Sequence, residues 1–319
     1  MTTRTKKRRP PNAPSIQAPQ QRTPREHGPL RWFLGGLVAT LAVAAIAIAA
    51  VLKDGDGKGT TAPQPTALSV QGLPDTPDYH SLLVSPANAS QILLGTHQGL
   101  YSSGDGGKTW QFEALSGQDA MNLARPAGRT LWTAGHNVFA KSTDGGRTWV
   151  NVNPSGLPTL DLHGFAVDPR QPRTLYAAVA GQGLYRSTDS GVSFSSVSSD
   201  VGGAVMALAV TPSGDILAGD MQRGLLLSRD GGNSWRPVFH ARLMGLSLNP
   251  KDARRILAAG PGIVLSTDGG RTWRQRLEIS DGAGPVAWSP SNPKIAYVVG
   301  FNRMLYRSTD SGETWSAVG

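Results

Sequence analysis

The feature that most constrains the fold is an eight-residue motif, Ser-x-Asp-x-Gly-x-x-Trp/Phe, which occurs six times. Its aromatic residues are 39, 45, 41, 38 and 42 residues apart, and a period of about 40 residues is typical of one β-propeller blade. The copies consist of Ser103, Asp105, Gly107 and Trp110; Ser142, Asp144, Gly146 and Trp149; Ser187, Asp189, Gly191 and Phe194; Ser228, Asp230, Gly232 and Trp235; Ser266, Asp268, Gly270 and Trp273; and Ser308, Asp310, Gly312 and Trp315. We therefore predict an all-β, six-bladed β-propeller over residues 67–319.

Each motif has the same surroundings, as residues 163–194 illustrate. An apolar segment ends at Pro169, two more apolar segments follow, and the motif begins at the end of the third. These segments are typical of strands A, B and C, with the motif as the turn before strand D. Within the turn, Asp can accept amide hydrogen bonds, Gly can supply a positive φ and the aromatic residue can pack between sheets. We interpret the motif as structural, since one Asp per turn is too few ligands for calcium.

The two ends of the repeat region are incomplete. Only four residues follow Trp315, too few for a full strand D. Residues 67–74 resemble residues 150–158, which follow the second motif. We therefore expect the N-terminal segment to complete the last blade and close the ring, which would remove two open sheet edges.

The six motifs resemble those of the BNR, or Asp-box, repeat proteins over the region from Ser81 to the C-terminus. This group includes sialidases, sortilin-type receptor domains, photosystem-assembly propellers and bacterial membrane-anchored proteins often named glycosyl hydrolases. The resemblance implies the propeller fold. It implies little about activity, because the motifs are scaffold elements and one architecture hosts many functions.

The N-terminal region predicts a membrane anchor. Residues 1–31 form a basic, proline-rich tail, and residues 32–52 contain no charge over 21 positions, enough for a transmembrane helix. The positive tail places the N-terminus in the cytoplasm, so we expect a single-pass protein of the cell membrane with an extracytoplasmic propeller. Residues 53–66 are typical of a flexible linker. The alternative is a signal peptide cleaved near Ala49.

Charge and cysteine content exclude several functions. The net charge is +9, but residues 1–31 carry +7 of it and the remainder only +2, so we expect no nucleic-acid partner. The chain has no cysteine, which excludes disulfides, thiolate metal sites and a cysteine nucleophile.

Sialidase chemistry is not expected. Sialidases resemble one another in an arginine triad, a Tyr nucleophile paired with Glu and usually an Arg-Ile-Pro motif, which this chain lacks. Its extracytoplasmic glutamates, Glu113, Glu278 and Glu313, fall in C-D turns or strand D. A different glycoside hydrolase would need two carboxylates about 5–9.5 Å apart. Asp78 and Asp161, on the connections that join strands D to A, are the candidates for such a pair.

A metal site is a further hypothesis. Beyond the tail, every histidine falls in a D-A or B-C connection, and these connections open on one face of the propeller. His80, His163, Met206 and Met244 occupy matching positions that should surround the central axis. Imidazole and thioether ligands suit copper, especially Cu(I). The alternative is that the methionines pack the channel and the histidines are ordinary loop residues.

The function that the sequence favours is a binding or assembly module. The predicted propeller would present its D-A and B-C face to a protein or glycan, because loops on a rigid scaffold commonly carry function. No catalytic set in the sequence is compelling, so we expect a protein that is not an enzyme. The alternatives are a glycoside hydrolase-like enzyme and an extracytoplasmic copper-binding protein.

Overall fold

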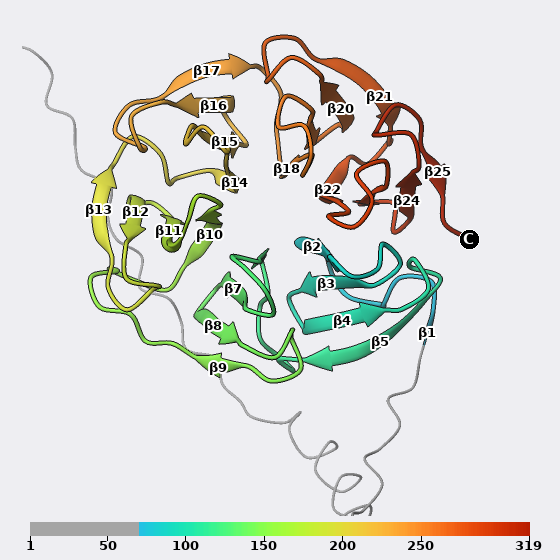
Figure 1. The fold of residues 1–319 in the computed structure, drawn as a ribbon, viewed down its shortest axis with the longest axis horizontal. Helices are drawn as coiled ribbons and strands as arrows, with labels where there is room; N and C mark the ends of the chain where they lie inside the picture. The colour runs from blue at the N-terminus through green and yellow to red at the C-terminus, as the bar shows by residue number, and fades with distance from the viewer. Residues whose placement is uncertain (1–69) are drawn as a thin grey trace, which may run out of the picture. The chain divides into compact units, whose positions relative to one another are not determined.

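Residues 70–319, which the computed structural model describes, form a β-propeller of six antiparallel sheets around a central axis (Figure 1). Within each sheet four consecutive strands follow chain order from the axis outward, which corresponds to strands A to D of a blade, and blade 1 has a fifth strand at its outer edge. Every described element is a strand. The predicted all-β, six-bladed propeller is therefore confirmed.

The strands are short, with five in blade 1 and four in each of the other blades. Blade 1 holds β1 (Val70–Gln71), β2 (Ser81–Val84), β3 (Ile92–Thr96), β4 (Gly99–Ser103) and β5 (Thr109–Ala114), and blade 2 holds β6 (Asn122–Ala124), β7 (Leu131–Gly135), β8 (Val138–Ser142) and β9 (Val150–Asn151). Blade 3 holds β10 (Leu162–Asp168), β11 (Gln171–Val179), β12 (Gly183–Ser187) and β13 (Ser195–Ser198), and blade 4 holds β14 (Val205–Val210), β15 (Ile216–Asp220), β16 (Gly224–Ser228) and β17 (Arg236–Phe239). Blade 5 holds β18 (Gly245–Leu248), β19 (Ile256–Ala259), β20 (Gly262–Ser266) and β21 (Arg274–Glu278), and blade 6 holds β22 (Ala283–Trp288), β23 (Ala296–Gly300), β24 (Leu305–Ser308) and β25 (Ser316–Ala317).

The predicted tail, transmembrane helix and linker, residues 1–66, lie outside the described residues. Within residues 70–319, no helix has the length and apolar character needed to cross a bilayer. The boundaries of the tail, the anchor and the linker therefore stay predictions.

The hydrophobic core lies between neighbouring blades. Strands B are apolar on both faces, and β19 and β23 are buried throughout because a blade packs against each side. The outer strands are more exposed; β9 and β25, for example, are exposed at both positions. Burying both faces of the inner strands supplies the main apolar contribution to stability, at about 25 cal/mol per Å².

Each Asp-box is a closed hydrogen-bonded turn, as the first copy shows. Ser103 Oγ donates to Asp105 Oδ1 over 2.9 Å and accepts from Gly107 N over 2.8 Å. Asp105 Oδ1 also accepts from Thr109 N at 3.0 Å, and Asp105 Oδ2 accepts from Thr109 Oγ1 at 2.7 Å. Trp110 Nε1 donates to Gly107 O over 3.0 Å. Both oxygens of the Asp105 carboxylate thus accept hydrogen bonds from within the turn.

The glycines of five of the six boxes also contact the preceding blade. A Cβ added at Gly107 would lie 2.0 Å from Leu305 Cδ2 of blade 6, so only glycine allows this contact. The third box repeats the arrangement, because Gly191 lies against Trp132 and Phe139 of blade 2. The motif therefore fixes both a turn and an interface between blades.

The predicted closure by the N-terminal strand is wrong. β1 pairs with β5, the outer strand of blade 1, and blade 6 receives its own outer strand, β25. The reason is that the two-residue β25 is enough to cover β24, which leaves the outer edge of β5 for the N-terminal segment. The ring closes instead through side chains, in a cluster that includes Leu94 of blade 1 and Tyr297 of blade 6.

Candidate functional site

Four histidines and three aspartates form one continuous cluster on the D-A and B-C face of blades 1 to 3. They are supplied by the segment before β2 (Asp78 and His80), the β3–β4 turn (His97), the β5–β6 connection (Asp119), the β7–β8 turn (His136) and the start of β10 with the residues before it (Asp161 and His163). These residues are spread over 86 positions of the sequence, from 78 to 163, and the D-A and B-C connections bring them together. We call this group the His–Asp cluster.

The blade 1 part of the cluster contains Asp78, His80 and His97. His80 Nε2 lies 3.1 Å from Asp78 Oδ1, and His97 Nε2 lies 3.0 Å from Asp78 Oδ2. The two rings meet edge to face, with centroids 4.3 Å apart. One carboxylate thus contacts two imidazoles.

The part between blades 2 and 3 contains His136, Asp161 and His163. The two Nε2 atoms of His136 and His163 are 3.1 Å apart. Asp161 Oδ1 lies 3.3 Å from the first of them and 3.0 Å from the second. The three atoms therefore form a nearly equilateral triangle of potential ligands.

Asp119 lies between the two parts and is buried, with 9% of its side chain exposed. Its Oδ1 is 2.9 Å from His97 Nδ1, and its Oδ2 is hydrogen-bonded to His136 Nδ1. The Nδ1 atoms of both imidazoles thus face Asp119, while their Nε2 atoms face Asp78 in one case and Asp161 and His163 in the other.

The three carboxylates of the cluster are paired only with histidines. Within the described residues, no lysine or arginine pairs with them. Burial lowers the pKa of His80, against the raising effect of Asp78 and Asp119. Burial thus favours the neutral imidazole, the state in which histidine can bind a metal.

The predicted metal ligands divide between two neighbouring places. His80, Met206 and Met244, together with Met121, line a cavity of about 80 Å³ formed by the inner strands of all six blades, β2, β6, β10, β14, β18 and β22, and by residues beside them. His163 lies instead in the triangle with His136 and Asp161. The histidines therefore have carboxylate neighbours, and the copper site with thioether ligands stays a prediction.

The predicted catalytic candidates, Asp78 and Asp161, both lie in the His–Asp cluster. Each is in contact with two histidines. A chain of contacts through His97, Asp119 and His136 connects the two aspartates. Pairing of these two carboxylates across a substrate stays a prediction.

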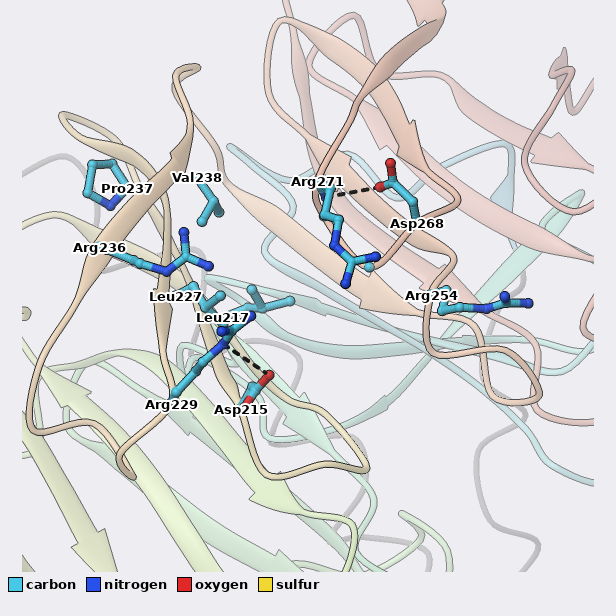
Figure 2. Close-up of a pocket in the computed structure, with 12 residues that line it drawn as sticks. Asp215, Leu217, Leu227, Arg229, Arg236, Pro237, Val238, Arg254, Asp268 and Arg271 are labelled. Atoms are coloured by element: carbon cyan, nitrogen blue, oxygen red, sulfur yellow. Dashed lines mark hydrogen bonds and ion pairs between the residues drawn. The ribbon is translucent and has the colours of Figure 1, made fainter.

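Sequence reasoning missed a second site, a groove rich in arginine between blades 4 and 5 (Figure 2). Its volume is about 570 Å³. Leu217, Leu227 and Val238 contribute apolar surface, and four arginines lie around it, Arg229 and Arg236 from blade 4 and Arg254 and Arg271 from blade 5. The groove lies beside the Asp-boxes, on the face that the sequence assigned to scaffold.

The groove has more positive than negative charge available to a ligand. Asp268 is held by its own box, accepting from Arg271 N and Thr272 N at 2.9 Å each. Arg254 is paired with Asp252, outside the groove lining. Among the described residues, no carboxylate lies within 4.0 Å of a side-chain nitrogen of Arg236 or Arg271. These two guanidinium groups are the ones best able to meet a carboxylate from a ligand.

Fold and repeats together define the class: a six-bladed Asp-box β-propeller. Residues 82–318 match the family model described as photosynthesis system II assembly factor YCF48, and the chain belongs to that family. The family is one of assembly factors, which agrees with the prediction of a binding or assembly module. No curated protein matches the sequence.

Solved structures show the same fold at low identity. A structure of YCF48 bound to a D1 peptide is 21% identical with a TM-score of 0.52, and the match covers 78% of this chain and 84% of that one. YCF48 from Cyanidioschyzon merolae is 19% identical with a TM-score of 0.50, covering 79% and 88%. A GH74 xyloglucanase from Xanthomonas campestris is 19% identical with a TM-score of 0.57, covering 80% of this chain and 47% of that one.

Proposed function

We propose that this chain is a membrane-anchored assembly factor whose extracytoplasmic propeller binds an extended, carboxylate-bearing segment of a client protein. The observation that carries this proposal is the arginine groove between blades 4 and 5. Family membership supports it, and so does the related YCF48 structure, which holds a D1 peptide. The uncharged segment at residues 32–52 supports the anchor.

The groove suits a peptide better than a compact small molecule. Its apolar residues can receive side chains, and Arg236 and Arg271 come from the two neighbouring blades that form the groove, so one extended segment can meet both (Figure 2). Guanidinium groups bind carboxylates in a bidentate manner, which gives direction as well as affinity. An acidic side chain or a C-terminal carboxylate is therefore the recognised group.

The test measures binding of a short fluorescein-labelled peptide of alternating Asp and Leu by anisotropy, with full-length protein in detergent. Each of Arg236→Ala and Arg271→Ala should weaken binding about tenfold or more, since a hydrogen bond to a charged group contributes roughly 1.5–3 kcal/mol. Affinity should fall with salt.

The matched control is Arg242→Ala, an exposed arginine in the connection before β18 and outside the groove. It should bind like wild type, and a peptide with Lys in place of Asp should bind none of the proteins. Equal affinity of the groove variants and the wild type for the acidic peptide would contradict the proposed site.

A further inference from the structure

The His–Asp cluster contains two copies of one arrangement. Asp78-x-His80 and Asp161-x-His163 each precede or begin a strand A, and each meets a histidine from a B-C turn: His97 of the same blade in the first copy and His136 of the preceding blade in the second. Asp119 lies between the copies, facing the Nδ1 atoms of both B-C histidines. The two copies therefore share their residue types but not their placement, since one lies within blade 1 and the other bridges blades 2 and 3.

Distances within the second copy match those between the ligands of one metal ion. Zn²⁺ binds imidazole nitrogen and carboxylate oxygen at about 2.0–2.2 Å, which places neighbouring ligand atoms roughly 3 Å apart. His136 Nε2, His163 Nε2 and Asp161 Oδ1 are 3.0–3.3 Å from one another. A single cation above this triangle would contact all three.

Protein hydrogen bonds account for only part of these contacts, since the His136 Nε2–His163 Nε2 contact can be one. Asp161 Oδ1, Asp78 Oδ1, His80 Nε2 and Asp119 Oδ1 are buried atoms without a hydrogen-bond partner, although a ring nitrogen or carboxylate oxygen lies close to each. Asp119 is 91% buried by side chain, so water reaches it poorly. Buried polar atoms are normally satisfied, and a bound ion is one of the ways in which they are.

The donor set selects the class of ion. Two imidazoles and one carboxylate in each copy suit divalent first-row transition ions, whereas Mg²⁺ and Ca²⁺ prefer oxygen ligands. Asp119 can accept the Nδ1–H groups of His97 and His136, which would fix their Nε2 atoms as the ligands. Asp119 is thus a positioning residue.

We propose that the propeller binds two divalent transition-metal ions, one at Asp78, His80 and His97 and one at His136, Asp161 and His163, with Asp119 orienting the two B-C histidines. This property is separate from peptide binding in the arginine groove, which lies between other blades.

The experiment titrates full-length, tag-free protein in detergent with ZnCl₂ by calorimetry and with CoCl₂ by visible absorption. The wild type should bind two equivalents, and Co²⁺ should give the d–d bands expected for imidazole and carboxylate ligands. His80→Ala and His163→Ala should each bind one equivalent, and the double variant none. His240→Ala changes an exposed histidine outside the cluster and should bind two.

Asp119→Asn should keep the stoichiometry but weaken binding about 10–100-fold, the usual effect of losing a carboxylate behind a ligating histidine. Zn²⁺ should raise the melting temperature of the wild type and not that of the double variant, which must show the same circular dichroism as the wild type. If either alanine variant misfolds, His80→Gln and His163→Gln replace it with the same expected loss.

Three results would overturn the proposal. The first is fewer than two equivalents bound by the wild type, and the second is unchanged stoichiometry in the histidine variants. The third is binding of Cu(I) alone, without Zn²⁺ or Co²⁺, which would indicate thioether ligands in the methionine-lined cavity.

Discussion

At the scale of single residues, the six boxes differ at the position after the aspartate. Four copies have glycine there with a positive φ, such as 80° at Gly106 and 77° at Gly269. Two copies have serine in the same left-handed conformation, Ser190 and Ser311, both with φ of 65°. A residue with a Cβ is disfavoured in this conformation, so these two turns are strained.

Replacing either serine by glycine should therefore stabilise the propeller. We expect Ser190→Gly and Ser311→Gly each to raise the free energy of unfolding by about 0.5–1 kcal/mol, the relief of strain less the entropy that glycine loses on folding. Urea denaturation measures the change. The reverse substitution Gly269→Ser, at a position with nothing within 4 Å of an added Cβ, should destabilise by a similar amount. A glycine variant less stable than wild type would contradict the argument.

The box aspartates also set the response to acid. Hydrogen bonds from Ser234 Oγ, Ser234 N and Ser228 Oγ lower the pKa of Asp230 to about 2, and the pKa of Asp144 is lowered in the same way. A carboxyl with a depressed folded-state pKa contributes stability above its unfolded pKa of about 4, and loses it as pH falls through the folded value. Melting temperature should thus drop between pH 4 and about 2. In Asp230→Asn the drop should be smaller, and an equal drop would contradict this assignment.

At the scale of elements, closure of the ring depends on packing and not on a shared strand. Leu305 of β24 is 2% exposed and lies against Gly107 of blade 1. Tyr297 donates a hydrogen bond to Ala89 O at 3.0 Å, and Arg303 pairs with Asp75. The Tyr297–Ala89 and Arg303–Asp75 contacts join blade 6 to the segments of blade 1 on either side of β2.

Two changes separate packing from strand pairing. Leu305→Ala should cost about 2–5 kcal/mol, the range for a buried leucine that leaves a cavity. Deletion of residues 67–71 removes β1, a two-residue strand, and should cost less, since each hydrogen bond contributes about 1 kcal/mol net. Chemical denaturation of both variants gives the comparison. A deletion more damaging than Leu305→Ala would contradict this ranking of packing over strand pairing.

The sequence could predict the blades because each Asp-box is local: Asp105 forms its hydrogen bonds with residues no more than four positions away. The pairing of Val70 with Trp110 spans 40 residues, and local pattern does not determine which free edge a segment joins. The face that carries the histidines was predictable from connectivity. Which carboxylate meets which imidazole was not, because loop conformation decides it. The arginine groove was missed because its residues come from strands and turns of two blades.

At the scale of the whole molecule, the basic tail determines the predicted topology. Residues 1–31 carry +7 and the chain from residue 32 onward only +2, so the tail should stay in the cytoplasm and the propeller should be outside. Gly319 is exposed beyond β25, so a fusion there leaves the last blade intact.

A reporter enzyme that is active only outside the cytoplasm, fused after Gly319, should be active and should sediment with membranes. Solubilising the fusion should require detergent. Active reporter in the soluble fraction, on a protein whose N-terminus lies near Ala49, would show instead that the segment is a cleaved signal peptide.

The junction between blades 6 and 1 has a consequence for how the chain can be rearranged. No strand crosses it, and Leu73 and Val318, near the two ends of the propeller, pack against the same cluster of side chains. This joint is therefore built like the other five, and the order in which the blades are synthesised is not part of the architecture. A circular permutant that joins the present ends with a short linker and opens the chain in the β9–β10 connection should assemble the same ring.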